Sequence, residues 1–400
     1  MANENNSSSL DLTELGDEFS DLDLTNANKK LAEHLSEIAA YYSLSRDVYR
    51  GKTFSEAAKL ISDYPFTITS GAHAKETIPR VGPSTIQVID QFLSKGTSKR
   101  MEELESIHKD RKETVDIFLQ VYGIGPALAN KYYDFGFRTL TDLWYEVPIS
   151  MAAEFNIVVE NINDVAIELG IIDEAVETEG DEDQLTILFY EVLRELARKN
   201  KLKYPTLTAA QRLGIQYFND LQERIPRSEI QLIEEKLKTA LSGLEWNIDW
   251  VIAGSYRRGE LNSGDIDILI KSKPGFSLPQ VVQMLTNEGL FIGDLARGPT
   301  KYMGILQYDS TTPARRVDLL VVPAYAWAYS ILYFTGSQRF NVLSRQRAIE
   351  LGFRLSEHGM TDSQGQSYPA KTEEDIFSML GIAFLTPEER VKGIPSLTFE

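Results

Sequence analysis

Residues 254–267 read Gly-Ser-Tyr-Arg-Arg-Gly-Glu-Leu-Asn-Ser-Gly-Asp-Ile-Asp, and the end of this stretch runs into a β-rich segment. Successive side chains of a strand point to opposite faces, so Asp265 and Asp267 lie on one face with their carboxylates close together. Like charges at such a separation are costly unless a cation neutralises them. The pair therefore predicts a divalent metal site, although an isolated Asp-x-Asp pattern is more often a solvated strand end.

A turn upstream and a third aspartate downstream favour the metal site over the solvated strand end. Gly254 and Ser255 supply a turn and a hydroxyl at a predicted helix start, and Arg258 supplies positive charge for phosphates. Asp318, in the apolar β-rich run 317–322, is the third carboxylate. Three carboxylates around two hard cations form a site for in-line phosphoryl transfer, in which one ion activates the attacking hydroxyl and the other binds the triphosphate.

Composition excludes several classes of protein. The 400 residues are 42% hydrophobic and 25% charged, which is ordinary for a globular chain of about two to four domains. No cysteine is present and the four histidines are scattered, which excludes disulfides and argues against a zinc enzyme. No secretory signal is recognisable, so we expect an intracellular protein. The uncharged run 319–338 contains Pro323 and three tyrosines, and we predict a buried strand, a helix and a turn there, not a membrane span.

The net charge of −18 is distributed very unevenly. Residues 1–28 and 139–193 contain many acids and no lysine or arginine, and the remainder carries a small net positive charge. Nucleic acid therefore stays possible as a partner. The first range predicts a disordered acidic tail or, alternatively, a partner-binding helix. The second contains an acidic insertion, densest at 173–183, which we expect to be exposed; it could repel DNA, compete with DNA for a basic cleft, dock a basic protein partner, or have no role.

A short motif occurs twice in the N-terminal half. Residues 78–82, followed by a predicted helix, resemble residues 122–131, so that Gly82 corresponds to Gly125. A glycine turn that leads into a helix start suits a phosphate, because glycine permits close backbone approach and the helix start offers free N–H groups. This is the helix-hairpin-helix pattern, which grips the DNA backbone without sequence preference. In the first copy Arg80 replaces a glycine, and the alternative for both copies is a plain turn between helices.

These motifs resemble those of the family X DNA polymerases, and within that family the polymerase beta type. The resemblance covers residues 31–143 and 201–390 and is most specific at residues 254–259, 264–267, 315–318 and 332–337. It implies an α+β fold with helix-hairpin-helix motifs in a helical N-terminal domain, a nucleotidyltransferase palm with a mixed β-sheet, and an α/β nucleotide-selection subdomain. The expected segments are the tail 1–28, a lyase-like DNA-end-binding domain 29–109, a hairpin domain 110–230 with the insertion at about 144–200, the palm 231–325 and the nucleotide-selection subdomain 326–400.

The resemblance also implies roles for individual residues. Asp265 and Asp267 are expected to bind two Mg²⁺ ions, for which Mn²⁺ can substitute, and Asp318 to bind the catalytic ion and accept the primer hydroxyl proton. Residues expected to bind the incoming deoxynucleotide triphosphate are Arg224, Gly254, Ser255, Arg258, Gly264, Tyr333, Phe334, Gly336 and Asn341. Residues expected to bind DNA are Arg50, Lys52, Lys75, Gly82, Gly123, Gly125, Arg316 and Arg345.

Four of these residues have structural alternatives. Arg224 could cap a helix or pair with an acid. Tyr333 and Phe334 could be core aromatics, and Asn341 could be a turn residue.

The chain departs from the family pattern at three positions that matter. Val88 stands where lyase-active members carry the Schiff-base lysine, and Ser84 replaces a neighbouring phosphate-binding lysine; no lysine occurs between Lys75 and Lys95. Leu320 stands where some relatives place an arginine involved in domain closure.

The resemblance therefore predicts template-directed, gap-filling DNA synthesis in repair without lyase activity. The predicted partners are gapped or nicked DNA and deoxynucleotides. We expect a monomer without membrane contact, located in the nucleus or wherever the DNA is. The alternatives are a template-independent terminal transferase and a non-catalytic DNA-end-binding scaffold.

Overall fold

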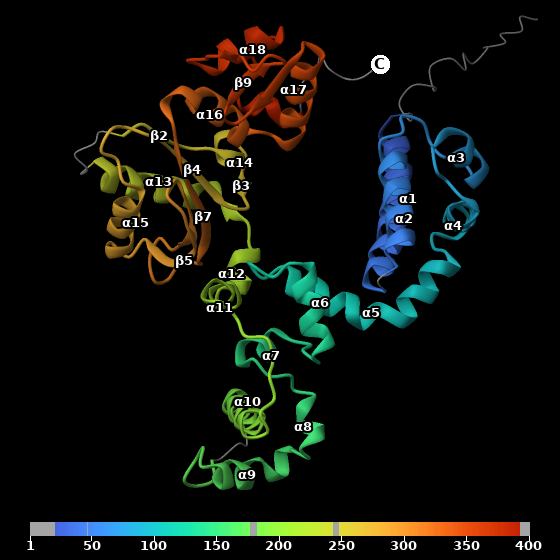
Figure 1. Cartoon of the computed structure of the whole chain (residues 1–400), viewed down its shortest axis with the longest axis vertical. Coiled ribbons are helices and arrows are strands. Elements are labelled where there is room, and N and C mark those ends of the chain that lie inside the picture. The colour runs from blue at the N-terminus through green and yellow to red at the C-terminus, as the bar shows by residue number, and fades with distance from the viewer. Residues whose placement is uncertain (1–20, 46, 177–181, 243–247, 393–400) are drawn as a thin grey trace, which may run out of the picture. The chain divides into compact units, whose positions relative to one another are not determined.

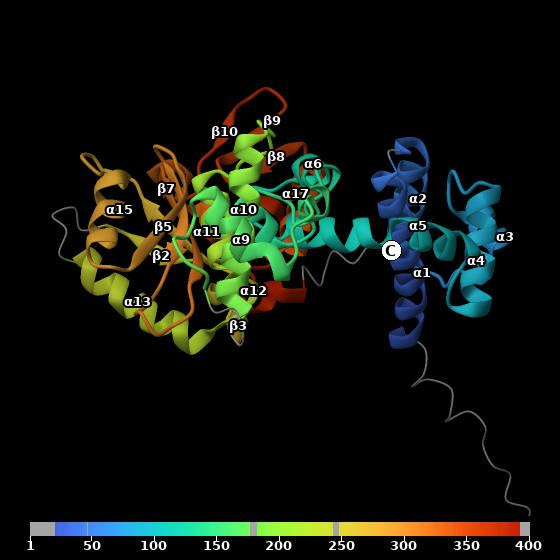
Figure 2. The same cartoon turned by 90° about the horizontal axis from the view of Figure 1, so that it is seen from below.

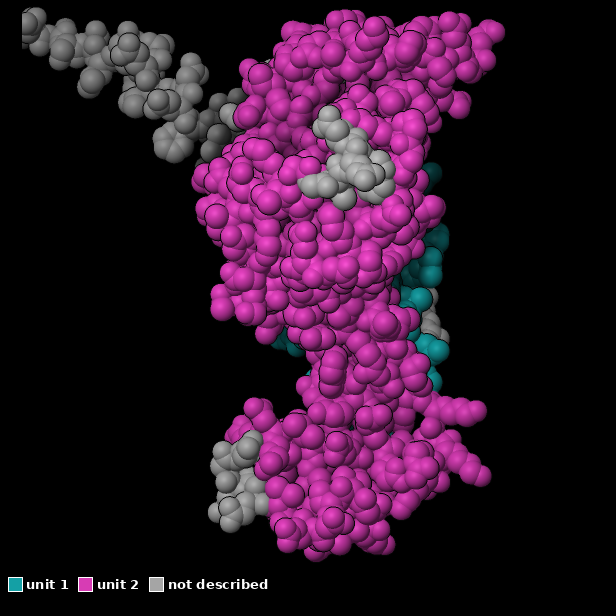
Figure 3. All heavy atoms as spheres, turned by 90° about the vertical axis from the view of Figure 1, so that its left-hand side faces the viewer, with its two compact units in different colours: residues 1–120, 125–139, 148–158 teal, residues 121–124, 140–147, 159–400 magenta. Residues whose placement is uncertain are grey.

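The computed structural model describes residues 21–45, 47–176, 182–242 and 248–392. The chain forms two compact units (Figure 3). The first comprises residues 1–120, 125–139 and 148–158, and the second comprises residues 121–124, 140–147 and 159–400. Helices dominate the first unit, whereas the second combines helices with β-sheets (Figures 1 and 2). The predicted α+β class is confirmed.

The helices of the first unit are α1 (Asp21–Leu44), α2 (Val48–Ser62), α3 (Gly71–Thr77), α4 (Pro83–Lys95), α5 (Lys99–Leu119), α6 (Pro126–Asp134) and α8 (Met151–Glu154). The helices of the second unit are α7 (Leu140–Tyr145), η1 (Val159–Asn161), α9 (Ile162–Leu169), α10 (Glu182–Lys199), α11 (Ala209–Gln216), α12 (Phe218–Gln222), α13 (Arg227–Ser242), α14 (Gly254–Arg257), α15 (Leu278–Asn287), η2 (Ala324–Ala326), α16 (Trp327–Thr335), α17 (Gln338–Glu350), α18 (Glu373–Leu380) and η3 (Glu388–Lys392). Its strands are β1 (Ile225–Pro226), β2 (Trp250–Ile252), β3 (Asn262–Ser263), β4 (Ile266–Lys271), β5 (Phe291–Arg297), β6 (Lys301–Leu306), β7 (Arg315–Val322), β8 (Phe353–Ser356), β9 (Gly359–Asp362) and β10 (Ser367–Tyr368).

Apolar residues three and four apart build the core of the first unit. Leu31, Leu35 and Ile38 repeat along one face of α1 and are fully buried, as a helix of 3.6 residues per turn requires. Helix α1 begins at Asp21, so it includes the last part of the segment expected to be a disordered tail; residues 1–20 lie outside the described residues.

The two predicted hairpin turns have the same backbone conformation. Arg80 and Gly123 both have positive φ, 64° and 79°, and Gly82 and Gly125 follow two residues later in extended conformation as the N-caps of α4 and α6. A proline begins each of these helices, where its missing N–H costs nothing. Arg80 therefore adopts the left-handed conformation that glycine takes in the second copy.

The central sheet of the second unit has the strand order β2-β4-β7-β6-β5. Strands β4 and β7 are parallel and the other neighbours are antiparallel, so the sheet is mixed. Their register sets Asp267 directly beside Asp318. Because side chains alternate along a strand, Ile266 and Ile268 pack toward α13 and α15, whereas Asp267 points to the other face.

The acidic insertion forms helices and is not a bare loop. Helix α10 packs on α7 and α9 and buries Leu188, Val192 and Leu193. The Tyr190 hydroxyl donates to the fully buried Asp142 carboxylate at 2.5 Å, which satisfies that charge. In the range 173–183, the described acids are all exposed, as predicted; they are Asp173, Glu174, Glu182 and Asp183. Glu177, Glu179 and Asp181 lie outside the described residues.

A smaller three-stranded sheet, β10-β9-β8, completes the second unit together with α16, α17 and α18. Within the described part of the chain, no helix has the length and apolar character needed to cross a membrane. The run 319–338, whose sequence resembles a membrane span, forms the second half of β7, then η2 and α16.

The two glycines of the second hairpin are expected to differ in their tolerance of a side chain. Gly123→Ala should lower the free energy of unfolding by about 1 kcal/mol, because alanine is strained at positive φ. Gly125 has negative φ and a β-carbon added there would meet no atom within 4 Å, so Gly125→Ala should lose only the N-cap preference for glycine over alanine, about 0.5 kcal/mol. Urea denaturation of both variants checks this, and equal losses would contradict it.

Candidate active site

A cleft of about 710 Å³ in the second unit contains the complete set of residues predicted to bind the nucleotide. It lies between the α14 loop, the start of β4 and the segment that joins α16 to α17. Its lining residues are Arg224, Gly254, Ser255, Arg258, Glu260, Gly264, Asp265, Asp267, Tyr333, Phe334, Gly336, Gln338, Asn341, Val342 and Arg345. The sequence did not single out Glu260, Gln338 and Val342.

Gly254 brings the backbone close to the carboxylates. Its φ is +59°, and a β-carbon there would lie 2.8 Å from Oδ2 of Asp267. A side chain at this position would displace the carboxylate, so glycine is required for two independent reasons. The next residue, Ser255, donates its hydroxyl hydrogen to Oγ of Ser263 at 2.8 Å.

The three carboxylates have different surroundings. Asp318 is buried, its Oδ2 lies 3.3 Å from Nζ of Lys301, and its Oδ1 has no hydrogen-bond partner. Asp265 forms an ion pair with Arg316. Two of the three carboxylates thus have a basic partner supplied by the chain itself.

Asp267 is the carboxylate whose protonation is most perturbed. Burial, followed by the negative charge of Asp318, raises the pKa of Asp267 to about 6, although Lys301 and Arg258 act in the opposite direction. Ionisation of both strand aspartates is therefore unfavourable without additional positive charge.

The donor set fits a hard divalent cation. Magnesium prefers carboxylate oxygens, and Asp318 offers a buried oxygen that no hydrogen bond satisfies. Among the described residues, no group of three or more acidic, histidine or cysteine side chains is already arranged to hold a metal ion. Arg316 engages Asp265 and Lys301 engages Asp318, so binding an ion would require these bases to give up their contacts.

Basic residues at the cleft are held by specific partners. Arg224 is exposed and donates to the side-chain and backbone oxygens of Asn262 at 2.8 and 3.0 Å. The alternative of an acid partner for Arg224 is therefore not seen among the described contacts. Arg258 donates to Glu260 and, at 2.6 Å, to the carbonyl of Thr335.

The predicted nucleotide-selection residues lie together on α16 and α17. Tyr333 and Phe334 are partly buried and meet edge to face, with ring centroids 5.1 Å apart. Asn341 lies on α17 and donates from Nδ2 to the carbonyl of Tyr333 at 2.8 Å, so the alternative of a turn residue is wrong. The guanidinium of Arg345 stands 4.8 Å from the Tyr333 ring centroid.

Leu320, the departure from the arginine of some relatives, packs in an apolar cluster with Leu269 and Phe334. The side chain that follows Asp318 on the same face of β7 is thus apolar and offers the cleft no charge.

Beside the cleft lies a buried charge cluster that the sequence did not predict. Arg257 donates to Thr335 and to Glu373, each at 2.6 Å, and Arg390 donates to Glu373 at 2.6 Å. Burial alone would raise the pKa of Glu373, but the two arginines together lower it below its ordinary value. Only Arg257 lies in a recognisable motif; Glu373 and Arg390 are single charges in unremarkable surroundings.

The remaining predicted DNA-binding residues lie in the first unit or at its hairpins. Arg50, Lys52 and Lys75 are exposed on α2 and α3. Arg50 pairs with Asp47, and Lys52 lies 3.9 Å from Glu56. Their exposure leaves them accessible to a ligand.

Val88, at the position of the Schiff-base lysine, is 2% exposed and belongs to the core of the first unit. Ser84 is exposed one turn earlier on α4. A lysine at position 88 would have to displace apolar neighbours.

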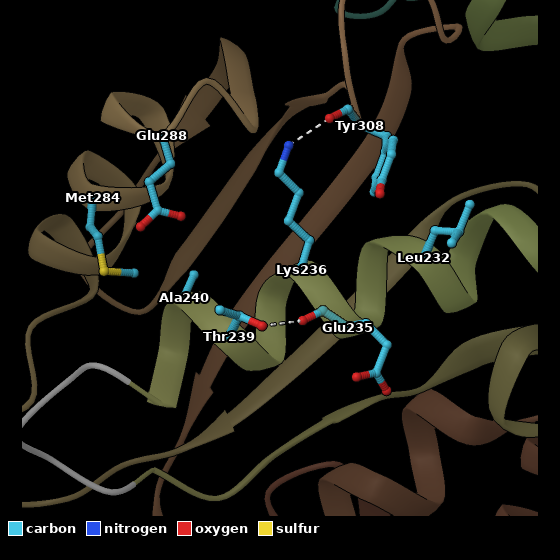
Figure 4. A pocket seen from close by; sticks show the side chains of 8 residues that line it. All are labelled: Leu232, Glu235, Lys236, Thr239, Ala240, Met284, Glu288 and Tyr308. Atoms are coloured by element: carbon cyan, nitrogen blue, oxygen red, sulfur yellow. Dashed lines mark hydrogen bonds between the residues drawn. The ribbon is translucent and has the colours of Figure 1, made fainter.

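A second open cleft, of about 660 Å³, lies between α13, α15 and the segment after β6 (Figure 4). Its one lysine, Lys236, donates to the carbonyl of Tyr308 at 2.6 Å, and Glu235 and Glu288 stand on its walls. A polyphosphate needs net positive charge, and the two acids of this cleft outnumber its single lysine. None of the predicted site residues lines it.

Four segments of the chain match known protein families. Residues 224–324 match the DNA polymerase beta palm and residues 330–391 match the DNA polymerase beta thumb. Residues 26–98 match a helix-hairpin-helix domain, and residues 116–150 match the fingers domain of DNA polymerase lambda.

Among curated proteins, the chain is similar to the DNA polymerase lambda of Rattus norvegicus and of Arabidopsis thaliana. Identity is 26% in both cases, over 387 and 388 residues, which is 92% and 91% of this chain. The chain spans 56% and 62% of the length of these two relatives. In chain order, the matched segments are the hairpin domain, the fingers, the palm and the thumb. Over most of its length the chain is thus similar to family X DNA polymerases of the beta and lambda types.

Proposed function

We propose that this chain is a template-directed DNA polymerase that adds deoxynucleotides to a primer 3′-hydroxyl and fills short gaps during DNA repair. The observation that carries the proposal is the register of β4 and β7, which sets Asp318 beside Asp267, and Asp267 lines a cleft together with the predicted nucleotide-binding residues. The similarity to family X DNA polymerases supports the same activity. We further propose that the partners are gapped DNA and deoxynucleotides, that the protein acts as a monomer, and that the acidic insertion could dock a basic protein.

Each residue of the cleft has a chemical task in this proposal. Two Mg²⁺ ions, when bound, would activate the hydroxyl and neutralise the triphosphate. Asp265, Asp267 and Asp318 would hold them, and the free oxygen of Asp318 suits the proton of the primer hydroxyl. Ser255 and Arg258 would bind the phosphates.

The nucleotide would be positioned by the segment between α16 and α17. Tyr333 and Phe334 present a rigid wall, because the Asn341 amide and the Arg345 guanidinium hold Tyr333 from two sides. Such a wall can exclude a ribose 2′-hydroxyl by contact alone.

Primer extension on three substrates tests the proposal: a one-nucleotide gap, an open template and a bare single strand. We expect synthesis on the first two that follows the template base. Extension of the bare strand with no template preference would indicate a terminal transferase, and DNA binding without extension would indicate a scaffold.

Asp318→Asn should reduce nucleotide addition by at least about 10³-fold while folding and DNA binding persist, because the missing charge is needed in the transition state. Asp249→Asn, at an exposed carboxylate remote from the cleft residues in the sheet, is the matched control. Single-turnover extension and a DNA-binding titration measure both effects. Near-normal extension by the Asp318 variant would refute the two-metal mechanism.

Stability should depend on pH through Asp267. Its pKa is about 6 in the folded protein against 3.8 as the ordinary value, so the folded state holds the proton more tightly than the unfolded chain does. Relative to Asp267→Asn, the metal-free protein should therefore lose about 1 to 3 kcal/mol as the pH rises from about 4 to about 6. The comparison with this variant is needed because carboxylates with a lowered pKa, such as Glu373, gain stability over the same range in both proteins. Urea denaturation across that range measures the effect.

The same ionisation should control cation binding. Millimolar MgCl₂ should raise the melting temperature above pH 6, where Asp267 is charged, and have little effect at pH 5. Asp267→Asn should be nearly insensitive to MgCl₂ at either pH. An identical MgCl₂ effect at both pH values would show that Asp267 is not a ligand.

The N-terminal unit should bind the 5′ end of a gap without cleaving the strand. Borohydride should trap no covalent adduct with an incised abasic site, because Val88 supplies no amine and is buried. An efficient adduct that is lost in Lys75→Ala or Lys52→Ala would show that another amine has taken over this role.

A further inference from the structure

We propose that the C-terminal end of α10 is an additional binding site for the DNA backbone, formed within the insertion and separate from the hairpins and the cleft. This basic end comprises Arg194, Arg198, Lys199, Lys201 and Lys203. It follows directly on residues 139–193, which contain no lysine or arginine. The inference deepens the proposed function, because it adds a contact to the same DNA substrate.

The basic end is displayed on an ordered scaffold. All five of its side chains are exposed, whereas Val192, Leu193 and Ala197 on the opposite side of α10 are buried. The helix is anchored by its packing on α7 and α9 (Figure 1) and by the hydrogen bond from Tyr190 to Asp142. The charges therefore stand on a fixed surface that faces solvent.

The positive charge is largely unneutralised by the protein. Arg198 pairs with Glu195 at 2.5 Å. In the described parts of the chain, no carboxylate lies within 4.0 Å of the charged groups of Arg194, Lys199, Lys201 or Lys203. Exposed cations without acid partners raise the local potential and attract a polyanion.

Stabilisation of the helix end does not account for the cluster. Bases in the last turn favour the negative end of the helix dipole, which suits Arg198 and Lys199. Lys201 and Lys203 lie beyond the helix. Lys201 has φ of +57° at the end of a Schellman motif, in which its N–H donates to Arg198 and the N–H of Leu202 donates to Ala197. Glycine is the favoured residue at such a position, so a lysine there is unfavourable for folding.

A nucleic-acid backbone fits this surface better than a single anion. The basic end spans a helical turn and the following extended residues, roughly 15 to 20 Å, which matches several phosphates along a strand. The exposed acids Asp173, Glu174, Glu182 and Asp183 precede and begin the same helix. DNA would attract the basic end and repel the acidic one, so the two charges orient the insertion.

The test compares two triple variants by their affinity for gapped duplex DNA across a salt series. Lys199→Gln/Lys201→Gln/Lys203→Gln should bind about tenfold more weakly at low salt. The slope of log K against log salt should become shallower by about 1 for each lysine that contacts a phosphate. The control, Lys238→Gln/Lys271→Gln/Lys273→Gln, removes three palm lysines that each lie 3.8 Å from an acid, and should leave the slope unchanged.

Lys201→Gly separates binding from folding. Glycine relieves the positive φ, so this variant should melt at or above the wild-type temperature and still lose about one unit of salt slope. Salt curves of the triple variant that coincide with wild type would overturn the inference. In that case, residues 1–20 would be deleted from the wild type and from the triple variant. If the deletion made only the wild type bind DNA more tightly, the basic end would be a binding site for the acidic N-terminal segment.

Primer extension by the wild type distinguishes the two proposals. Absence of extension with the expected change of salt slope would refute the polymerase activity and retain the DNA contact. Normal extension with an unchanged salt slope would support the polymerase activity and refute the DNA contact at the basic end.

Discussion

The repulsion between Asp267 and Asp318 is the constraint on which the candidate site in the central sheet depends. The parallel pairing of β4 and β7 sets them side by side, and burial prevents water from screening their charges. The chain moderates the conflict with the lysine beside Asp318 and with a proton that Asp267 holds up to about pH 6. Gly254 has no side chain, which leaves room for the carboxylate of Asp267. Bound cations would remove this repulsion, which is the physical reason for the proposed metal site.

A second buried charge connects the two walls of the cleft. Glu373 on α18 accepts hydrogen bonds from Arg257 on α14 and from Arg390 on η3, and Arg257 also reaches Thr335 on α16. Because the arginines keep the pKa of Glu373 low, this contribution to stability is present above the ordinary pKa near 4.5 and is lost at lower pH. One guanidinium nitrogen of Arg390 remains without a partner, so the pairing is incomplete. Helices α14, α16 and α18 are thus joined by charge as well as by packing.

The parts of this fold that follow local periodicity could be predicted from the sequence. Alternation predicted β4 and β7 and the face of Asp267, because a strand has only two faces. The charge cluster at Glu373 could not be predicted, since Arg257 precedes Glu373 by 116 residues and only tertiary packing unites them. Asn341 was open to interpretation as a turn residue because it follows a Thr-Gly-Ser segment, yet α17 begins just after that segment. In the insertion, the many acids concealed the apolar spacing that buries one face of α10.

A residue other than glycine that has positive φ adopts a backbone conformation that is unfavourable for folding. Its side chain is therefore expected to form an interaction that offsets this cost. Glu146 has φ of 61°, but its carboxylate accepts from Leu207 and pairs with Arg212, so contacts inside the protein offset the strain. Arg80 has only an exposed ion pair with Glu56, and the ammonium of Lys201 has no acid within 4.0 Å among the described residues. Exposed ion pairs contribute little to stability, so internal contacts do not explain why a base stands at either turn. A cation that extends from a tight turn is well placed to bind a phosphate. Binding of a phosphate outside the chain would therefore explain why a base stands at each of these turns.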